Sequence, residues 1–202
     1  MTAYRVLVVD DHAAVRSGLT ALLGDEPDLR PVGAASGARE ALELAQRLAP
    51  DVAVVDFQLG DRDGLTLCRQ LKELPTPTRV LLYSAYADGP LALAAVIAGA
   101  DGVVHKSALA DDLCRAIRLV AAGGAAVPAI SPASQAMVAE CLEADDLPIL
   151  GMLVAGTEPA DIAEVLGVQP DWLAARRWAM VERLRRVSSR RVSAAAGRGM
   201  PA

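Results

Sequence analysis

The chain has 202 residues, which fits one ordinary domain and a smaller second one, and its 53% hydrophobic content with only 3% aromatic residues requires cores of Ala, Val and Leu. Charge is segregated, because residues 1–175 carry 12 basic and 24 acidic side chains while residues 176–202 carry eight arginines and a single glutamate. No apolar run reaches the roughly 18 residues of a membrane span, and no signal-peptide pattern opens the chain, so we expect a cytoplasmic protein without membrane contact. The three cysteines are widely spaced and form no zinc motif.

Short apolar runs alternate with amphipathic segments over the first part of the chain. The runs, which are typical of strands buried on both faces, span residues 5–9, 29–34, 52–55, 79–83 and 102–105. Segments with helical periodicity follow them at residues 13–23, 38–48, 64–74, 90–99 and 110–122. This alternation predicts an α/β fold with a doubly wound, five-stranded parallel sheet of the flavodoxin-like kind, over residues 1–123.

The rest of the chain has a different pattern. Two glycines and two prolines interrupt the periodicity at residues 123–134, and we place the interdomain linker at residues 124–141. Helical segments at 144–155, 159–166 and 170–186 then predict a small all-α domain over residues 142–187, whose last two helices form a helix-turn-helix. Residues 188–202 contain mostly Arg, Ser, Ala and Gly, so we expect a basic, disordered tail.

Acidic residues follow two of the predicted strands. Asp10 and Asp11 come directly after the first strand, and Asp56 comes directly after the third. Ligands of such sheets bind at the carboxyl ends of the strands, where these carboxylates should converge and repel one another unless a cation lies between them. Mg²⁺ prefers carboxylate and water oxygens, so the sequence predicts a magnesium site.

The last two strands end in a hydroxyl and an ammonium group. Ser84 ends the fourth strand and Lys106 follows the fifth. Acids, a hydroxyl and a lysine at neighbouring strand ends suit the transfer of a phosphoryl group onto a carboxylate, because the cations neutralise the oxygens and the hydroxyl donates to one of them.

In these features the chain resembles the receiver domain of two-component response regulators, in particular the NarL/FixJ class. The resembling stretches are Val8–His12, Val55–Phe57 with Asp63–Gly64 downstream, Ser84–Ala85 and Gly99–Lys106. The resemblance implies that Asp56 is the phosphoacceptor and that Ser84 and Lys106 hold the phosphoryl group. It further implies Mg²⁺ bound by Asp11, Asp56 and the backbone carbonyl of Gln58, with Asp10 as an outer-shell ligand. A sensor histidine kinase and a homodimer are the partners that it implies.

Some features favour other interpretations or depart from the family. Each acid alone would equally suit a helix cap, and His12 beside the acid pair suits a surface or packing role better than a metal ligand. Where the family has a Met-Pro-Gly turn, this chain has Leu59–Asp61, which adds a flexible glycine and a negative charge. Val103 stands where receivers carry the aromatic residue that transmits phosphorylation, which puts this transmission in question, and Tyr86 is the nearby ring available to substitute for it.

Residues 142–184 resemble the LuxR-type helix-turn-helix, whose last helix enters the major groove of DNA. The outward face of the third predicted helix carries alanines, Trp178 and Glu182, and therefore few hydrogen-bond donors for DNA bases. Phosphate contacts would come from the arginine cluster, in which we assign DNA binding to Arg176, Arg183, Arg185 and Arg186.

Two functions remain open. The first is a transcription regulator that is phosphorylated on Asp56 and binds DNA through its helix-turn-helix. The second is a receiver-controlled protein-interaction or dimerisation module whose helix-turn-helix does not read DNA. An enzyme of the haloacid-hydrolase kind is disfavoured, because Gln58 stands where such enzymes place their second aspartate.

Overall fold

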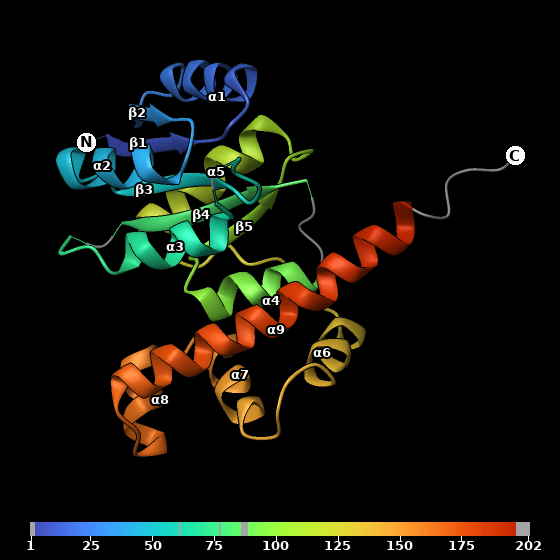
Figure 1. The fold of residues 1–202 in the computed structure, drawn as a ribbon. Coiled ribbons are helices and arrows are strands. Elements are labelled where there is room, and N and C mark those ends of the chain that lie inside the picture. Colours follow the sequence, from blue (N-terminus) through green and yellow to red (C-terminus); the bar gives the residue numbers. More distant parts are fainter. Residues whose placement is uncertain (1–2, 61, 77, 86–88, 197–202) are drawn as a thin grey trace, which may run out of the picture. The chain divides into compact units, whose positions relative to one another are not determined.

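The computed structural model describes residues 3–60, 62–76, 78–85 and 89–196, with side chains up to residue 186 (Figure 1). Its five strands form one parallel sheet in the order β2-β1-β3-β4-β5. They are β1 (Tyr4–Val9), β2 (Leu29–Ala35), β3 (Val52–Asp56), β4 (Arg79–Ser84) and β5 (Gly102–His105). The predicted five-stranded parallel sheet is confirmed, and each strand lies within two residues of its predicted bounds.

Helices cover both faces of the sheet. They are α1 (Ala13–Gly24), α2 (Ala38–Leu48), α3 (Gly64–Lys72) and α5 (Ala110–Ala121), and α4 (Gly89–Ala98) lies between β4 and β5 in the chain. Apolar residues of α1 and α5 form one buried cluster with β-strand side chains such as Val6, Val8 and Val54. Side chains of α2 surround Gly33 together with Leu7, whose side chain points to the opposite face of β1.

The chain divides into two compact units. The first comprises residues 1–87 and 99–128, and the second comprises residues 88–98 and 129–202. Helix α4 therefore groups with the C-terminal helices, and it contacts α6, α7 and α9. Its sequence, Gly-Pro-Leu-Ala-Leu-Ala-Ala-Val-Ile-Ala, contains no polar side chain, and seven of its ten residues are buried. A helix that is apolar on all sides requires cover on all sides, which accounts for these contacts.

Besides α4, the second unit contains α6 (Pro132–Ala139), α7 (Asp146–Val154), α8 (Pro159–Leu166) and α9 (Pro170–Ala196). Helix α8 ends at Gly167, whose φ of 64° lies in the left-handed region that favours glycine. The turn at Gly167 joins α8 to α9, as the helix-turn-helix pattern predicts. Apolar residues of α6 to α9 form the core of this unit, among them Val138, Ile149, Leu150, Leu153, Ile162, Leu173, Met180 and Leu184.

The boundaries differ from our expectations in two places. Residues expected in the linker are structured: Ala126 bonds to β5, and α6 begins where Ser131 accepts a hydrogen bond from the backbone of Ser134, with Pro132 in the first turn. Helix α9 continues to Ala196 instead of ending at Arg186, so the expected tail is helical up to that residue. The stretch from Val187 to Ala196 contains no glycine or proline to stop the helix. Residues 197–202 lie outside the described part.

Candidate functional site

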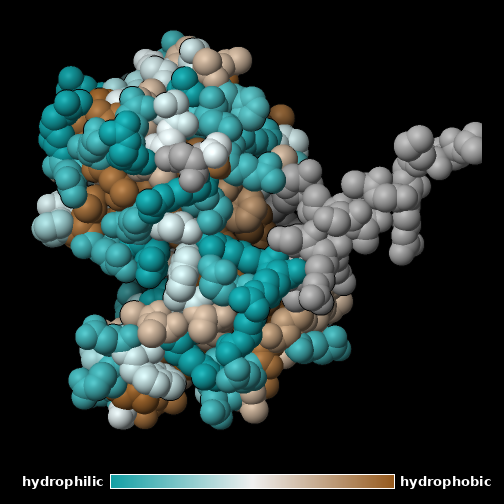
Figure 2. All heavy atoms as spheres, in the orientation of Figure 1, coloured by the Kyte–Doolittle hydropathy of each residue, from teal (hydrophilic) through white to brown (hydrophobic). Residues whose placement is uncertain are grey.

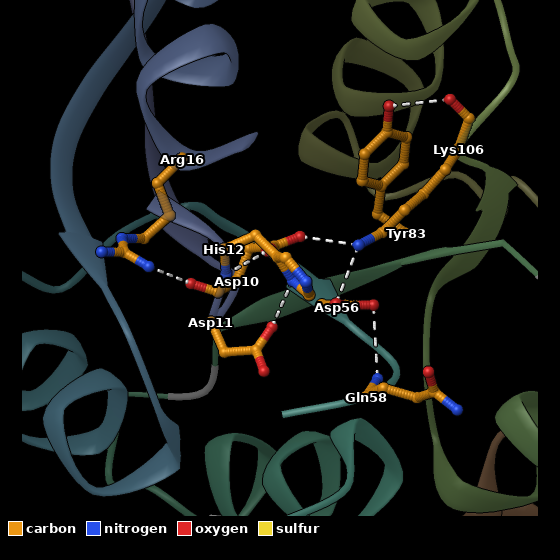
Figure 3. A network of polar contacts seen from close by, with 8 residues as sticks. All are labelled: Asp10, Asp11, His12, Arg16, Asp56, Gln58, Tyr83 and Lys106. Carbon is orange, nitrogen blue, oxygen red and sulfur yellow. Dashed lines mark hydrogen bonds and ion pairs between the residues drawn. The ribbon is translucent and has the colours of Figure 1, made fainter. Parts of the chain in front are cut away.

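The three predicted carboxylates converge at the carboxyl ends of β1 and β3. Val9 pairs with Val55, so the residues that follow them, Asp10 and Asp56, are neighbours, and both are buried. Asp11 is more exposed. One ligand atom each from Asp10, Asp11, His12 and Asp56 lies within 4.8 Å of the others (Figure 3). Such crowding of acidic oxygens suits a hard divalent cation, and exposed Asp11 leaves the cluster open to water.

Lys106 reaches this cluster from the end of β5. Its Nζ lies 2.7 Å from Asp10 Oδ2 and 2.8 Å from Asp56 Oδ2 (Figure 3). Burial acts to lower the pKa of Lys106, but the hydrogen bonds to the two aspartates outweigh it and leave the pKa above its ordinary value. Burial raises the pKa of Asp56, and the hydrogen bond from Lys106 only partly opposes this effect. Lys106 is thus an ammonium group held against the Asp56 carboxylate.

Ser84 ends β4, the strand that lies between β3 with Asp56 and β5, which Lys106 follows. It is buried, and its carbonyl accepts a 2.8 Å hydrogen bond from the backbone of Lys106. The preceding residue, Tyr83, lies opposite Asp56 in the pairing of β3 with β4. Ser84 therefore lies at the same edge of the sheet as Asp56 and Lys106, as the strand pattern predicts.

The loop after β3 returns toward Asp56. The backbone N–H of Gln58 donates to Asp56 Oδ1 at 3.3 Å, and Gly64 donates to the carbonyl of Phe57 at 2.7 Å. Asp63 starts α3 by accepting a 3.0 Å hydrogen bond from the backbone of Thr66. The Asp63–Gly64 pair thus closes the loop that carries Gln58. Asp61 in the same loop lies outside the described residues.

His12 is placed within the acid cluster. Its Nδ1 lies 2.7 Å from Asp11 Oδ1 and 3.5 Å from Asp10 Oδ1, while 70% of its side chain is exposed. Its backbone N–H donates to Asp10 at 2.8 Å. In the sequence, these contacts of His12 were indicated only by its position next to Asp10 and Asp11. The imidazole is exposed, but it also lies within reach of the acid cluster, so its surface or packing role stays a prediction.

The aromatic residue beside the site is one that the sequence did not indicate. Val103 is buried in β5, and Tyr86, the ring available to substitute for an aromatic there, lies outside the described residues. Instead, the ring of Tyr83 on β4 lies beside Lys106, with Nζ 5.7 Å from its centroid.

Comparison with known proteins identifies the family. Residues 6–118, more than half of the chain, match the response regulator receiver domain. The chain belongs to the response regulators. The regulator is 32% identical to the transcriptional regulatory protein UhpA of Salmonella typhimurium over 180 residues, which are 89% of this chain and 90% of UhpA. The resemblance noted in the sequence is thereby confirmed.

Other relatives match mainly the receiver part. The DNA-binding transcriptional activator DevR/DosR of Mycobacterium tuberculosis is 41% identical over 119 residues, which are 59% of this chain and 55% of that protein. The crystal structure of a LuxR-family response regulator from Aurantimonas is 32% identical, with a TM-score of 0.60 over 69% of this chain and 97% of the other. The chain thus spans about half the length of the first of these relatives.

Three of the four arginines assigned to DNA in this response regulator have acidic partners within its own second unit. Arg176 donates to Asp146 at 2.5 Å and to Glu143 at 2.7 Å, and Arg183 binds the same two acids, with 2.8 Å to Asp146. Asp146 itself is fully buried. Of the four assigned arginines, Arg186 alone has an exposed side chain.

Arg185 and Arg177 also have partners. Arg185 donates to Glu182 at 2.6 Å and lies 4.7 Å from the ring centroid of Trp178. Arg177 donates to the carbonyl of Ile97 in α4 at 2.9 Å. Among the described residues, no helix is both long enough and apolar enough to cross a bilayer.

Proposed function

We propose that this response regulator is switched by a sensor histidine kinase, which transfers a phosphoryl group to Asp56. The observation that carries the proposal is the position of Lys106 Nζ, 2.8 Å from the Asp56 carboxylate and 2.7 Å from Asp10. An ammonium fixed there is placed to neutralise oxygens of a phosphoryl group as it arrives. The carboxylate of Asp56 forms the new O–P bond, the P–N bond of the donor phosphohistidine breaks, and the Ser84 hydroxyl donates to a phosphoryl oxygen.

The acid cluster fits Mg²⁺ by its donor set. Asp11, Asp56 and the backbone carbonyl of Gln58 would hold the ion, with Asp10 as an outer-shell ligand that also binds Lys106. When bound, Mg²⁺ neutralises the negative charge that three carboxylates and a phosphoryl group bring together. Lys106 and Ser84 then hold the oxygens that the ion does not.

Incubation with acetyl phosphate and Mg²⁺ is expected to add one phosphoryl group to the wild-type chain and none to Asp56→Asn, because a side-chain amide is not a nucleophile that can accept the phosphoryl group in place of the Asp56 carboxylate. Intact-protein mass spectrometry measures the added mass. Asp25→Asn, which changes an exposed aspartate at the end of α1, is the matched control and should be labelled like the wild type. Equal labelling of Asp56→Asn would refute the assignment.

For the output, we propose transcription regulation by a homodimer that binds paired DNA half-sites through α8 and α9. Support comes from the relatives, since DevR/DosR is a DNA-binding transcriptional activator and UhpA a transcriptional regulatory protein. Arg186 and its neighbours Arg176, Arg183 and Arg185 would supply attraction to phosphates. Three of these four must first exchange acidic partners for DNA.

One observation favours a second candidate, a protein-interaction output. From Gly156 to Ala175 every charged side chain is acidic and exposed: Glu158, Asp161, Glu164 and Asp171. Val165 and Trp172 in the same stretch are 72% and 46% exposed. Where Figure 1 labels α8, Figure 2 shows hydrophobic next to hydrophilic atoms. A surface of this kind repels phosphate and suits a protein partner.

Selection of genomic DNA fragments by the phosphorylated protein separates the two outputs. Enrichment of one sequence motif is expected if the unit reads DNA, and Arg186→Ala should then weaken binding to all sequences about equally and keep the motif. Weak binding that lacks a motif and disappears as salt is raised is the result expected of arginines that attract phosphate without reading sequence. That second result would replace the DNA-reading output by the protein-interaction output.

A further inference from the structure

Tyr83 occupies an unusual position beside the proposed phosphorylation site. It lies on β4 opposite Asp56 of β3 and opposite Val104 of β5. Its ring is half-buried and packs against the cluster that α1 and α5 form with the sheet. The ring is therefore held by apolar packing and is a fixed surface at the edge of the site.

This fixed ring contacts both ends of Lys106. The hydroxyl of Tyr83 donates to the backbone carbonyl of Lys106 at 3.2 Å, and Lys106 Nζ lies 5.7 Å from the ring centroid (Figure 3). The second distance falls within the range of a cation–π contact. The next residue on β4, Ser84, accepts the backbone N–H of Lys106 at 2.8 Å. Adjacent residues of β4 thus hold the backbone of Lys106 on both sides, and the ring faces its ammonium group.

Such support matters because a lysine side chain is long and flexible. Holding its ammonium in one place loses rotamer freedom unless neighbouring groups already restrict it. Val103 on β5, the strand that precedes Lys106, has no ring that could restrict it. We infer that Tyr83 is a positioning residue that aims Lys106 at the phosphoryl group on Asp56. The inference rests on the proposed function and adds a residue that none of the site motifs contains.

The test measures the initial rate of labelling by acetyl phosphate with saturating Mg²⁺. Tyr83→Leu, which loses both contacts, is expected to lower the rate about tenfold, and Tyr83→Phe, which keeps the ring, only about threefold. Tyr4→Leu is the matched control, because Tyr4 packs against the same core cluster but begins β1, at the edge of the parallel sheet opposite to Lys106. Its rate should stay within about twofold of the wild type. Thermal unfolding by circular dichroism verifies that each variant is folded.

A double-mutant cycle separates positioning from general stability. In a Lys106→Ala background, Tyr83→Leu should leave the labelling rate unchanged, because there is no longer an ammonium to aim. An equal loss with and without Lys106 would overturn the inference, as would a Tyr83→Leu rate equal to that of Tyr4→Leu. If Tyr83→Leu does not fold, the same cycle is run with Tyr83→Phe. Labelling of wild type but not of Asp56→Asn shows independently that the proposed function stands.

Discussion

Asp146→Ala is expected to lower the free energy of unfolding of the C-terminal helical unit by about 3 kcal/mol. The fully buried carboxylate accepts hydrogen bonds from Arg176 at 2.5 Å, from Arg183 at 2.8 Å and from the backbone of Glu143 at 2.9 Å. Its removal leaves two half-buried guanidinium groups beside the exposed carboxylate of Glu143. Removing one partner of a buried ion pair strongly lowers the free energy of unfolding, because the remaining charge stays buried without its partner.

The measurement uses the distribution of aromatic residues. Both tryptophans of the chain, Trp172 and Trp178, lie in α9, so tryptophan fluorescence during urea unfolding reports on this unit. Asp145→Asn changes the exposed neighbouring aspartate and should stay within about 0.5 kcal/mol of the wild type. A midpoint for Asp146→Ala equal to that of this control would mean that the ion-pair cluster contributes nothing to stability.

Asp146 also illustrates where sequence reasoning stops. Eight arginines near the end of the chain were visible as a charge pattern and predicted contacts with phosphate. Two of them bind acids 30 and 37 residues away in sequence, and no local periodicity encodes such a pair. The same holds for Tyr83, which meets Lys106 only because β4 and β5 pair side by side.

The receiver fold and its acid cluster could be predicted because their signals are local. Apolar runs followed by Asp10, Asp56 or Lys106 place a side chain at a strand end, and parallel pairing brings strand ends together. The start of α6 was equally local, since Ser131 followed by Pro132 is a helix-start signal, but the surrounding glycines and prolines indicated a linker. The grouping of α4 with the C-terminal helices depends on tertiary packing, although its lack of polar residues was a visible signal.

The second large effect is expected at Gly64, where alanine should destabilise the receiver unit by about 2–3 kcal/mol and reduce labelling of Asp56 at least tenfold. A Cβ at this position would lie 2.4 Å from the carbonyl oxygen of Asp56 and 2.9 Å from the Cα of Phe57. Both atoms belong to the backbone and cannot rotate away. The loop must therefore move, and with it the backbone of Gln58, which holds the Asp56 carboxylate.

Gly18→Ala is the matched control for this variant, because nothing lies within 4 Å of a Cβ at Gly18 and the residue is exposed in α1. Alanine is the better helix former, so this control should be as stable as the wild type or up to about 1 kcal/mol more stable, with unchanged labelling. All three tyrosines, Tyr4, Tyr83 and Tyr86, precede α4, whereas both tryptophans lie in α9. A urea transition that near-UV circular dichroism detects and tryptophan fluorescence does not therefore reports on the receiver unit. Wild-type labelling by a destabilised Gly64→Ala would mean that loop closure supports the fold alone. Loss of labelling at unchanged stability would assign Gly64 to the geometry of Asp56.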